Sequence, residues 1–137
     1  MFFPKEYIMK GNFRLHSGDY TDTFYDVNAM LTQRPLLNKI LTEIDLNSWG
    51  VDCFVGISTA GAIIASHNFS GDFAMVKDGE VKGIVDAPYM LIDDVCTTEA
   101  SLKEAIDIIG QKPETIFVVV DRRKEKTLEI KAIWHLK

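Results

Sequence analysis

The sequence is poor in cysteine and has no excess of positive charge, and each shortage excludes a class of protein. Cys53 and Cys96 stand alone, outside any CxxC or Cys/His metal-binding spacing, so we expect free thiols in a reducing setting. The formal net charge is −5. Nucleic acid is therefore not expected as the main partner, because binding to a long phosphate backbone needs a basic surface. A small anionic ligand held by backbone N–H groups remains compatible with this charge.

Long apolar runs, internal repeats and flexible linkers are also missing. No apolar run is near the length of about 18 residues that a membrane span needs. Lys5, Glu6 and Lys10 interrupt the N-terminal apolar stretch, so we expect no signal peptide and a cytoplasmic location. The chain has 137 residues, of which 47% are apolar. This is enough for one contiguous core, and we expect a single domain over residues 1–137.

Short apolar strands alternate with amphipathic helices along the chain. Strands are expected at 12–16, 23–26, 53–57, 73–76, 89–92, 115–120 and 130–136, the last at a sheet edge. Helices are expected at 35–49 with Thr32 as its cap, at 62–67, and at 99–109 with Gly110 as its stop. A turn-rich segment at 77–86 reads as a hairpin or short loop. This alternation predicts an α/β fold with a parallel sheet flanked by helices, whose ligands bind beyond the carboxyl ends of the strands.

The segment 90–101, MLIDDVCTTEAS, has the clearest chemistry. An apolar strand ends, the carboxylates of Asp93 and Asp94 follow, and a run of hydroxyl and small residues leads into a helix. Unpaired N–H groups at a helix start favour an anion such as a phosphate monoester. The two carboxylates can accept hydrogen bonds from sugar hydroxyls or hold Mg²⁺ through water. The same pattern also fits an ordinary turn in which Asp94 or Thr97 caps the helix.

Four stretches together resemble a known family. MLIDDVCTTEAS resembles the ribose-5-phosphate-binding motif of type I phosphoribosyltransferases. FRLHSGDYTDTFYDVN, DCFVGISTAGAIIA and FVVVDRRKEKTLEIKAIWHL resemble, in the family's order, the substrate segment, pyrophosphate loop and closing strands of the orotate branch. The resemblance covers most of the chain. It implies a Rossmann-like core over about residues 31–137, preceded by a base-side segment over about residues 1–30.

The resemblance implies an enzyme of pyrimidine biosynthesis in a shortened form. It would transfer ribose 5-phosphate between phosphoribosyl pyrophosphate and an orotate-like base, with Mg²⁺ and as a homodimer, with neither nucleic acid nor membrane as partner. The implied catalytic residues are Asp93, Asp94 and Lys77, with Mg²⁺ near the two carboxylates through water or ligand. The implied phosphoribose-binding residues are Thr97, Thr98, Glu99, Ala100 and Ser101. The implied pyrophosphate-binding residues are Thr59, Ala60 and Gly61, and the base-binding residues are His16, Phe24, Tyr25 and Arg122.

The local patterns also allow structural roles for the base-side residues. Phe24 and Tyr25 fit core aromatics, Arg122 fits a solvated basic run, and His16 fits a surface turn.

The chain departs from the family in two places. Glu99 and Ala100 stand where the family carries glycine. A carboxylate facing the phosphate would repel it by about 1 kcal/mol at about 4 Å in water, and replacing Glu99 by glycine would then tighten phosphate binding. Pointing outward at the helix start, the same carboxylate would be favourable.

The second departure concerns the long basic loop of the orotate branch. The matching region, residues 76–83, is much shorter, and Lys77 and Lys82 are the cations left to substitute for that loop. Removing preorganised cations should raise the barrier to glycosyl transfer. A second hypothesis is therefore a non-catalytic module of the same fold that binds a nucleotide or sugar phosphate, and a third is a scaffold without ligand.

Overall fold

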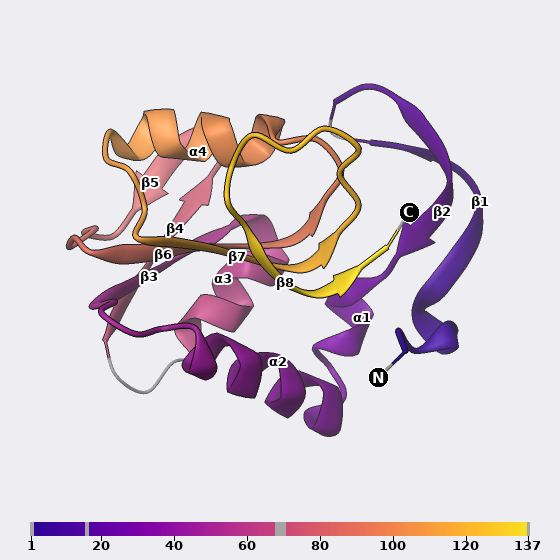
Figure 1. The fold of residues 1–137 in the computed structure, drawn as a ribbon, viewed down its shortest axis with the longest axis horizontal. Helices are drawn as coiled ribbons and strands as arrows, with labels where there is room; N and C mark the ends of the chain where they lie inside the picture. Colours follow the sequence, from indigo (N-terminus) through magenta and orange to yellow (C-terminus); the bar gives the residue numbers. More distant parts are fainter. Residues whose placement is uncertain (1, 16, 68–70, 137) are drawn as a thin grey trace.

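A six-stranded sheet forms the centre of the computed structural model, which describes residues 2–15, 17–67 and 71–136 (Figure 1). The strand order is β5-β4-β3-β6-β7-β8. Their bounds are β3 Cys53–Ile57, β4 Asp72–Lys77, β5 Glu80–Lys82, β6 Tyr89–Cys96, β7 Thr115–Asp121 and β8 Lys131–His135. All neighbours pair in parallel except β5, which pairs antiparallel with β4. The predicted α/β fold with a parallel sheet is confirmed.

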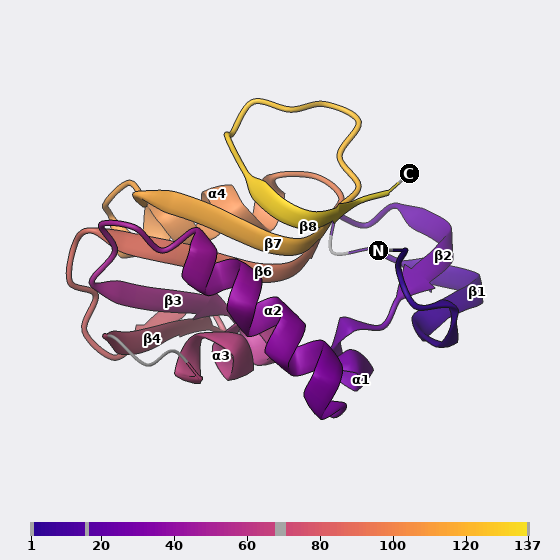
Figure 2. The ribbon, with the colours of Figure 1, turned by 60° about the horizontal axis from the view of Figure 1, so that its bottom comes forward.

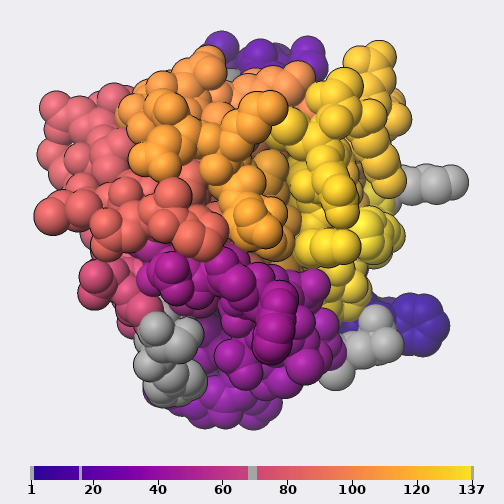
Figure 3. Space-filling view, turned by 60° about the vertical axis from the view of Figure 1, so that its left-hand side comes forward, coloured from indigo at the N-terminus to yellow at the C-terminus, as the bar shows by residue number. Residues whose placement is uncertain are grey.

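Helices cover both faces of this sheet (Figure 2). The helices are α1 Val27–Met30, α2 Arg34–Leu46, α3 Ser58–Ser66 and α4 Ala100–Ile109, with a short 3-10 turn η1 at Lys5–Tyr7. Side chains alternate across a strand, so Phe54 of β3 packs with α1, α2 and α3 while its neighbour Val55 packs with α4. The segment between β7 and β8 packs beside α4, as the yellow and orange regions of Figure 3 show. None of the described helices is long and apolar enough to cross a bilayer.

The N-terminal segment forms a separate antiparallel hairpin. Strands β1 (Ile8–Arg14) and β2 (Tyr20–Tyr25) pair with each other and not with the main sheet. Arg122, just after β7, ties this hairpin to the core, because its Nη1 donates to the Thr23 carbonyl oxygen at 3.1 Å. The hairpin is therefore held where β7 ends.

Several predicted element boundaries are wrong. Thr32 does not cap the first long helix: its hydroxyl donates to the Ala29 carbonyl at 2.6 Å, and α2 begins two residues later with Pro35 in its first turn. That helix ends at Leu46 rather than at residue 49. The next helix, α3, begins at Ser58, directly at the end of β3, rather than at residue 62.

The first two strands also begin earlier than predicted, at Ile8 and Tyr20 rather than at residues 12 and 23, whereas three other features agree with the prediction. Gly110 ends α4 in the left-handed conformation with φ of 82°, as predicted. The expected hairpin after β4 is present and turns on Asp78 and Gly79, whose φ values are both positive. β8 is an edge strand, also as predicted.

Gly61 allows α3 to lie close against β6. A Cβ atom at this position would lie 2.6 Å from the main-chain oxygen of Ile92. This distance is shorter than real Cβ contacts allow, and a backbone atom cannot swing aside as a side chain would. The close approach of α3 to the middle of the sheet therefore requires glycine here.

We predict that Gly61→Ala lowers the free energy of unfolding by about 1–3 kcal/mol, because the added methyl group must push α3 away from β6. The measurement is chemical denaturation followed by circular dichroism. Ser66→Ala, at the exposed end of the same helix, is the control and should change stability by less than about 0.5 kcal/mol. Equal stability of the Gly61 variant and the wild type would show that α3 does not press on Ile92.

Candidate functional site

The site lies where β6 extends beyond its neighbour β3. The two strands pair only as far as Gly56 and Ile92, while β6 continues to pair with β7 as far as Cys96 and Asp121. Asp93 and Asp94 therefore belong to the strand itself, which corrects the expectation that they follow its end. Beyond Ile92 one edge of β6 is free of β3. In this sheet the chain order reverses between β3 and β6, and such a switch point is where open α/β sheets bind ligands.

A cavity of about 220 Å³ collects most of the predicted phosphoribose and base residues. Its lining includes the predicted residues Phe24, Tyr25, Asp93, Asp94, Thr97, Thr98, Ser101 and Arg122. These residues come from β2, β6, the turn into α4 and the end of β7. Segments that are about 70 to 100 residues apart in sequence thus meet at one cavity, as the family resemblance implies.

Asp93 is the buried member of the carboxylate pair. It is 7% exposed, whereas Asp94 is only partly buried. Burial, and then the charge of Asp94, raise the pKa of the Asp93 carboxyl well above its ordinary value. A carboxyl buried in the wall of this cavity is suited to a hydrogen bond with a sugar hydroxyl.

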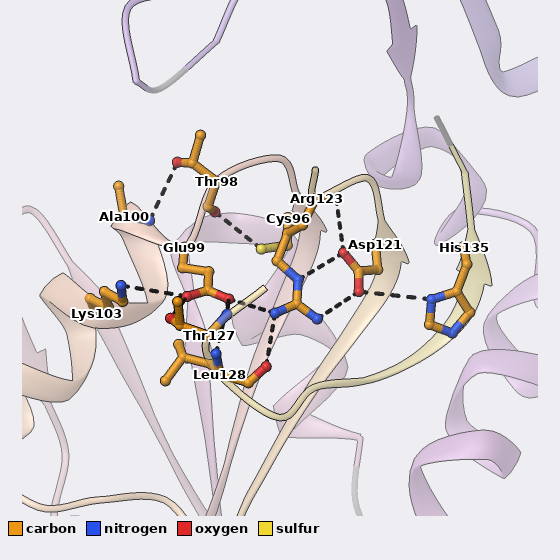
Figure 4. A network of polar contacts seen from close by, with 10 residues as sticks. All are labelled: Cys96, Thr98, Glu99, Ala100, Lys103, Asp121, Arg123, Thr127, Leu128 and His135. Atoms are coloured by element: carbon orange, nitrogen blue, oxygen red, sulfur yellow. Dashed lines mark hydrogen bonds and ion pairs between the residues drawn. The ribbon is translucent and has the colours of Figure 1, made fainter. Parts of the chain in front are cut away.

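Glu99 does not face the phosphate position, so the repulsion considered from the sequence does not arise. Its side chain is 5% exposed and points toward the segment between β7 and β8 (Figure 4). One carboxylate oxygen accepts from Arg123 Nη1 at 2.5 Å, from the Thr127 N–H at 2.8 Å and from the Leu128 N–H at 3.0 Å. The alternative expectation, that the Glu99 carboxylate points outward at the start of the helix, is wrong as well, because this side chain is buried.

The orientation of Glu99 leaves the start of α4 free for an anion. Glu99 is the N-cap residue of α4, yet its side chain makes no capping hydrogen bond. It therefore does not compete with a ligand for the N–H groups of the first helical turn. Thr98 Oγ1 accepts from the Ala100 N–H at a long 3.4 Å. The assignment of residues 97–101 to a phosphate stays a prediction that the geometry accommodates.

Arg122 lies in the cavity wall rather than in a solvated basic run. Its guanidinium lies 4.9 Å from the centre of the Tyr25 ring, and Nη2 donates to Thr21 Oγ1 at 3.3 Å. Its Nε is, among the described residues, the one buried side-chain nitrogen or oxygen that lacks a hydrogen-bond partner. A buried donor left unpaired is unfavourable, so this atom is suited to an acceptor on a ligand.

The two predicted base-side aromatics differ in burial. Tyr25 is 9% exposed and packs edge-on against Phe3 in the core, yet it also lines the cavity. Phe24 is 38% exposed and stacks on Phe13 with ring centres 5.4 Å apart. The core and site interpretations of Tyr25 are therefore compatible. The predicted base-side residue His16 lies outside the described residues.

A second cavity, of about 520 Å³, is lined by the same two carboxylates. Asp93 and Asp94 line it together with Lys77 and Ser58. Lys82, the other cation of the short hairpin, is instead paired with Glu80 at 2.5 Å on the exposed surface. Lys77 is thus the hairpin lysine that stands beside the carboxylates.

The predicted pyrophosphate residues are divided between surface and interior. Thr59 is exposed, whereas Ala60 and Gly61 are buried in α3, and Gly61 packs against β6. None of the three lines the second cavity as the structure describes it; Ser58, one residue earlier, does. Ser58 has φ of 56°, which is unusual for a residue other than glycine. Such strain often marks functional turns, and the pyrophosphate role of Thr59, Ala60 and Gly61 stays a prediction.

The carboxylate pair suits Mg²⁺ only together with a substrate. Among the described residues, no three His, Cys, Asp or Glu side chains are grouped to hold a metal. Asp93 and Asp94 each use one oxygen to accept a main-chain N–H at 2.8 Å, from Asp94 and Val95 respectively. Mg²⁺ commonly binds through one or two carboxylates plus waters and substrate phosphates. These residues fit that mode and form no preformed cage.

Among the lining residues that the sequence did not assign to the site are Arg14, Cys96 and Ser58. Arg14 lines the first cavity as a second arginine beside Arg122. Cys96 lines it with its thiol 3.1 Å from the Thr98 carbonyl, and burial raises the pKa of that thiol to about 12. Ser58 lines the second cavity. All three lie inside stretches that resemble the family, Arg14 in the substrate segment, Ser58 in the pyrophosphate loop and Cys96 in the ribose-5-phosphate motif.

Comparison with curated proteins finds distant relatives, although no protein-family model matches the chain. The chain is 31% identical over 132 residues to an orotate phosphoribosyltransferase of Staphylothermus marinus, covering 83% of this chain and 64% of the relative. It is 26% identical over 126 residues to the transcriptional regulator GfcR of Methanocella arvoryzae, covering 74% of this chain and 59% of the relative. The chain thus spans about three fifths of the length of these two curated relatives.

Solved structures with the same fold come from several phosphoribosyltransferases. The orotate phosphoribosyltransferase of Aeropyrum pernix superposes with a TM-score of 0.73 at 23% identity, covering 85% of this chain and 77% of that chain. That of Mycobacterium tuberculosis in complex with 5-phospho-α-D-ribosyl 1-diphosphate has a TM-score of 0.65 at 15% identity, covering 80% and 79%. The APRTase of Giardia lamblia complexed with 9-deazaadenine has a TM-score of 0.59 at 20% identity, covering 84% and 81%. At these identities the likeness establishes the fold.

We predict that Asp93→Asn raises the melting temperature at pH 7. An unfolded chain releases the Asp93 proton at about pH 4, whereas the folded protein holds it to a higher pH because the pKa is raised. The free energy of unfolding therefore falls as pH rises from about 4 toward the raised pKa. An amide cannot ionise and removes this loss. Thermal unfolding of both proteins from pH 4 to pH 8 measures the effect, with the exposed Asp107→Asn as control. A variant that is less stable than wild type at pH 7 would contradict the burial argument.

Proposed function

We propose that the chain belongs to the type I phosphoribosyltransferase family and that it transfers ribose 5-phosphate between phosphoribosyl pyrophosphate and an orotate-like pyrimidine. The proposal is supported most by one observation. The carboxylate pair, the hydroxyl-rich start of α4 and the unpaired Nε of Arg122 line a single cavity. An ordinary strand-to-helix turn would explain the first two features but not the third.

In the proposed step, a ring nitrogen of the base bonds to C1 of the ribose. The bond from C1 to the pyrophosphate oxygen breaks, pyrophosphate leaves with the bonding electrons, and the ring-nitrogen proton passes to solvent. Asp93 and Asp94 hold the ribose hydroxyls, and the N–H groups at the start of α4 hold the 5′-phosphate. Mg²⁺, when bound with the substrate, would offset the negative charge of the leaving pyrophosphate. A homodimer remains an expectation from the family.

The base side favours a pyrimidine with an anionic substituent. Arg122 and Arg14 both line the first cavity near Phe24 and Tyr25. Arginine pairs with a carboxylate through two parallel hydrogen bonds, and an aromatic wall suits a planar ring. A base without an anionic group would leave both guanidinium groups without a charged acceptor. This is the reason to place orotate-like bases ahead of adenine.

We predict that phosphoribosyl pyrophosphate with Mg²⁺ raises the melting temperature, and that orotate absorbance then falls on mixing with the protein. A ligand that binds only the folded state must stabilise it. The measurements are scanning fluorimetry and absorbance, with adenine and hypoxanthine as alternative bases. Stabilisation by nucleoside monophosphates with no turnover on any base would contradict the enzymatic proposal and support a binding module instead.

We predict that Lys77→Met lowers kcat/KM by about tenfold or more, because it removes the hairpin cation beside the carboxylates. Lys82→Met is the matched control, since Lys82 lies on the same hairpin but pairs with exposed Glu80. The control should retain nearly wild-type kinetics and melting temperature. Equal losses in the two variants would mean that Lys77 has no special place in the reaction.

A further inference from the structure

A buried charged network joins the start of α4 to the end of β7 (Figure 4). Its centre is Arg123, whose side chain is 3% exposed. The guanidinium donates to Asp121 through Nε at 2.9 Å and Nη2 at 2.8 Å, a two-point contact. Nη1 donates to Glu99 at 2.5 Å and to the Leu128 carbonyl at 2.8 Å. One side chain therefore bridges two carboxylates and a main-chain oxygen.

The second carboxylate, Glu99, draws in the segment that follows β7. Besides Arg123, it accepts hydrogen bonds from the main-chain N–H groups of Thr127 and Leu128 and from the Thr127 hydroxyl. Lys103 approaches the same carboxylate from the exposed side, at 3.5 Å. Burial alone would raise the pKa of Glu99, but these hydrogen bonds outweigh burial and hold its pKa below the ordinary value. The carboxylate is therefore charged and fully engaged.

The network connects the two halves of the proposed ligand site. Glu99 belongs to the 97–101 segment that is assigned to the 5′-phosphate. Asp121 and Arg123 flank Arg122, which lies against the base side. The main chain adds a further link, since the Arg122 N–H donates to the Cys96 carbonyl at 2.8 Å. Movement of either segment would break hydrogen bonds in a buried charged cluster, which is strongly unfavourable.

We propose that Arg123 is a positioning residue that fixes the 97–101 segment, through Glu99, and Arg122, through Asp121, in one rigid unit. The ligand-binding part of this inference rests on the proposed function; the rigidity does not. Glycine at position 99 would leave the 97–101 segment flexible. In this chain the Glu99 side chain, which is bonded to Arg123, restrains the segment instead. The phosphate and base ends of a nucleotide would then be bound by a preorganised frame.

The test combines amide hydrogen exchange with calorimetry on three variants. Arg123→Met removes the bridge, and Glu99→Gln keeps the side-chain size and one acceptor while removing the ion pair. Lys103→Met is the matched control, because Lys103 touches the same carboxylate but is 55% exposed. The probes are ribose 5-phosphate, for the 97–101 segment alone, and orotidine 5′-monophosphate, for both ends.

In Arg123→Met we expect faster exchange of residues 97–101 and 122–128, and affinity for both probes about tenfold weaker, as for loss of a charged hydrogen bond. Glu99→Gln should show a smaller change in the same direction, and Lys103→Met should match the wild type. Glu99→Gln carries the test if Arg123→Met does not fold.

A purely structural role would give a different result. The variants would then have lower melting temperatures than the wild type. Well below those melting temperatures, however, the amide exchange of residues 97–101 and the affinities for both probes would equal those of the wild type. This result would overturn the proposal. If the wild type binds neither probe, the proposed function fails. Exchange of the 97–101 segment then decides the positioning claim by itself: faster exchange supports it and unchanged exchange refutes it.

Discussion

The unequal reach of β3 and β6 is the constraint on which the site depends. Because β3 stops pairing with β6 at Gly56 and turns into α3, the last residues of β6 have β7 on one side and, in the part of the chain that the structure describes, no strand on the other. Asp93 and Asp94 lie on this part of the strand and line both cavities, Asp93 buried and Asp94 only partly so. Gly61 makes this possible, since it lets α3 pass within contact distance of Ile92 and leave the edge beyond uncovered.

The same constraint explains why the site is locally unfavourable for stability. Asp93 lies at the point where the buried interior of β6 meets the free edge, so its carboxyl is shielded from water while Asp94 is only partly so. Adjacent acids in such a position repel each other, and burial penalises the charge. Ser58, which lines the second cavity with these two acids, adds backbone strain. Unfavourable local features gathered around one crevice are typical of a functional site.

Local patterns predicted the fold and the turn from β6 into α4, whereas the role of that turn as a phosphate site rests on the family resemblance and stays a prediction. Apolar alternation revealed the strands, and the acids followed by hydroxyl residues revealed the turn into α4. The orientation of the Glu99 side chain could not be predicted from local patterns. Its partners Arg123 and Leu128 lie 24 and 29 residues further along the chain, and no local pattern reports such distant contacts.

The two adjacent arginines show the same limit. In the sequence, Arg122 and Arg123 form one basic run. Neighbouring residues at the end of an extended strand point in opposite directions, so Arg122 reaches the N-terminal hairpin while Arg123 enters the buried network. The role of each arginine follows from this alternation and from partners that the strand end brings near. Charge composition alone assigns both to solvent.

The electrostatics of the shortened hairpin follow from these features. A two-residue turn at Asp78 and Gly79 leaves no room for a long basic loop, and Lys77 is the hairpin cation beside the carboxylates. A polyanionic donor approaching Asp93 and Asp94 would meet strong repulsion if both were ionised. Burial and the charge of Asp94 raise the pKa of the Asp93 carboxyl well above its ordinary value, so ionising both members of the pair is unfavourable. The buried position of one carboxyl therefore acts against the repulsion that two fully ionised carboxylates would present to a polyanion.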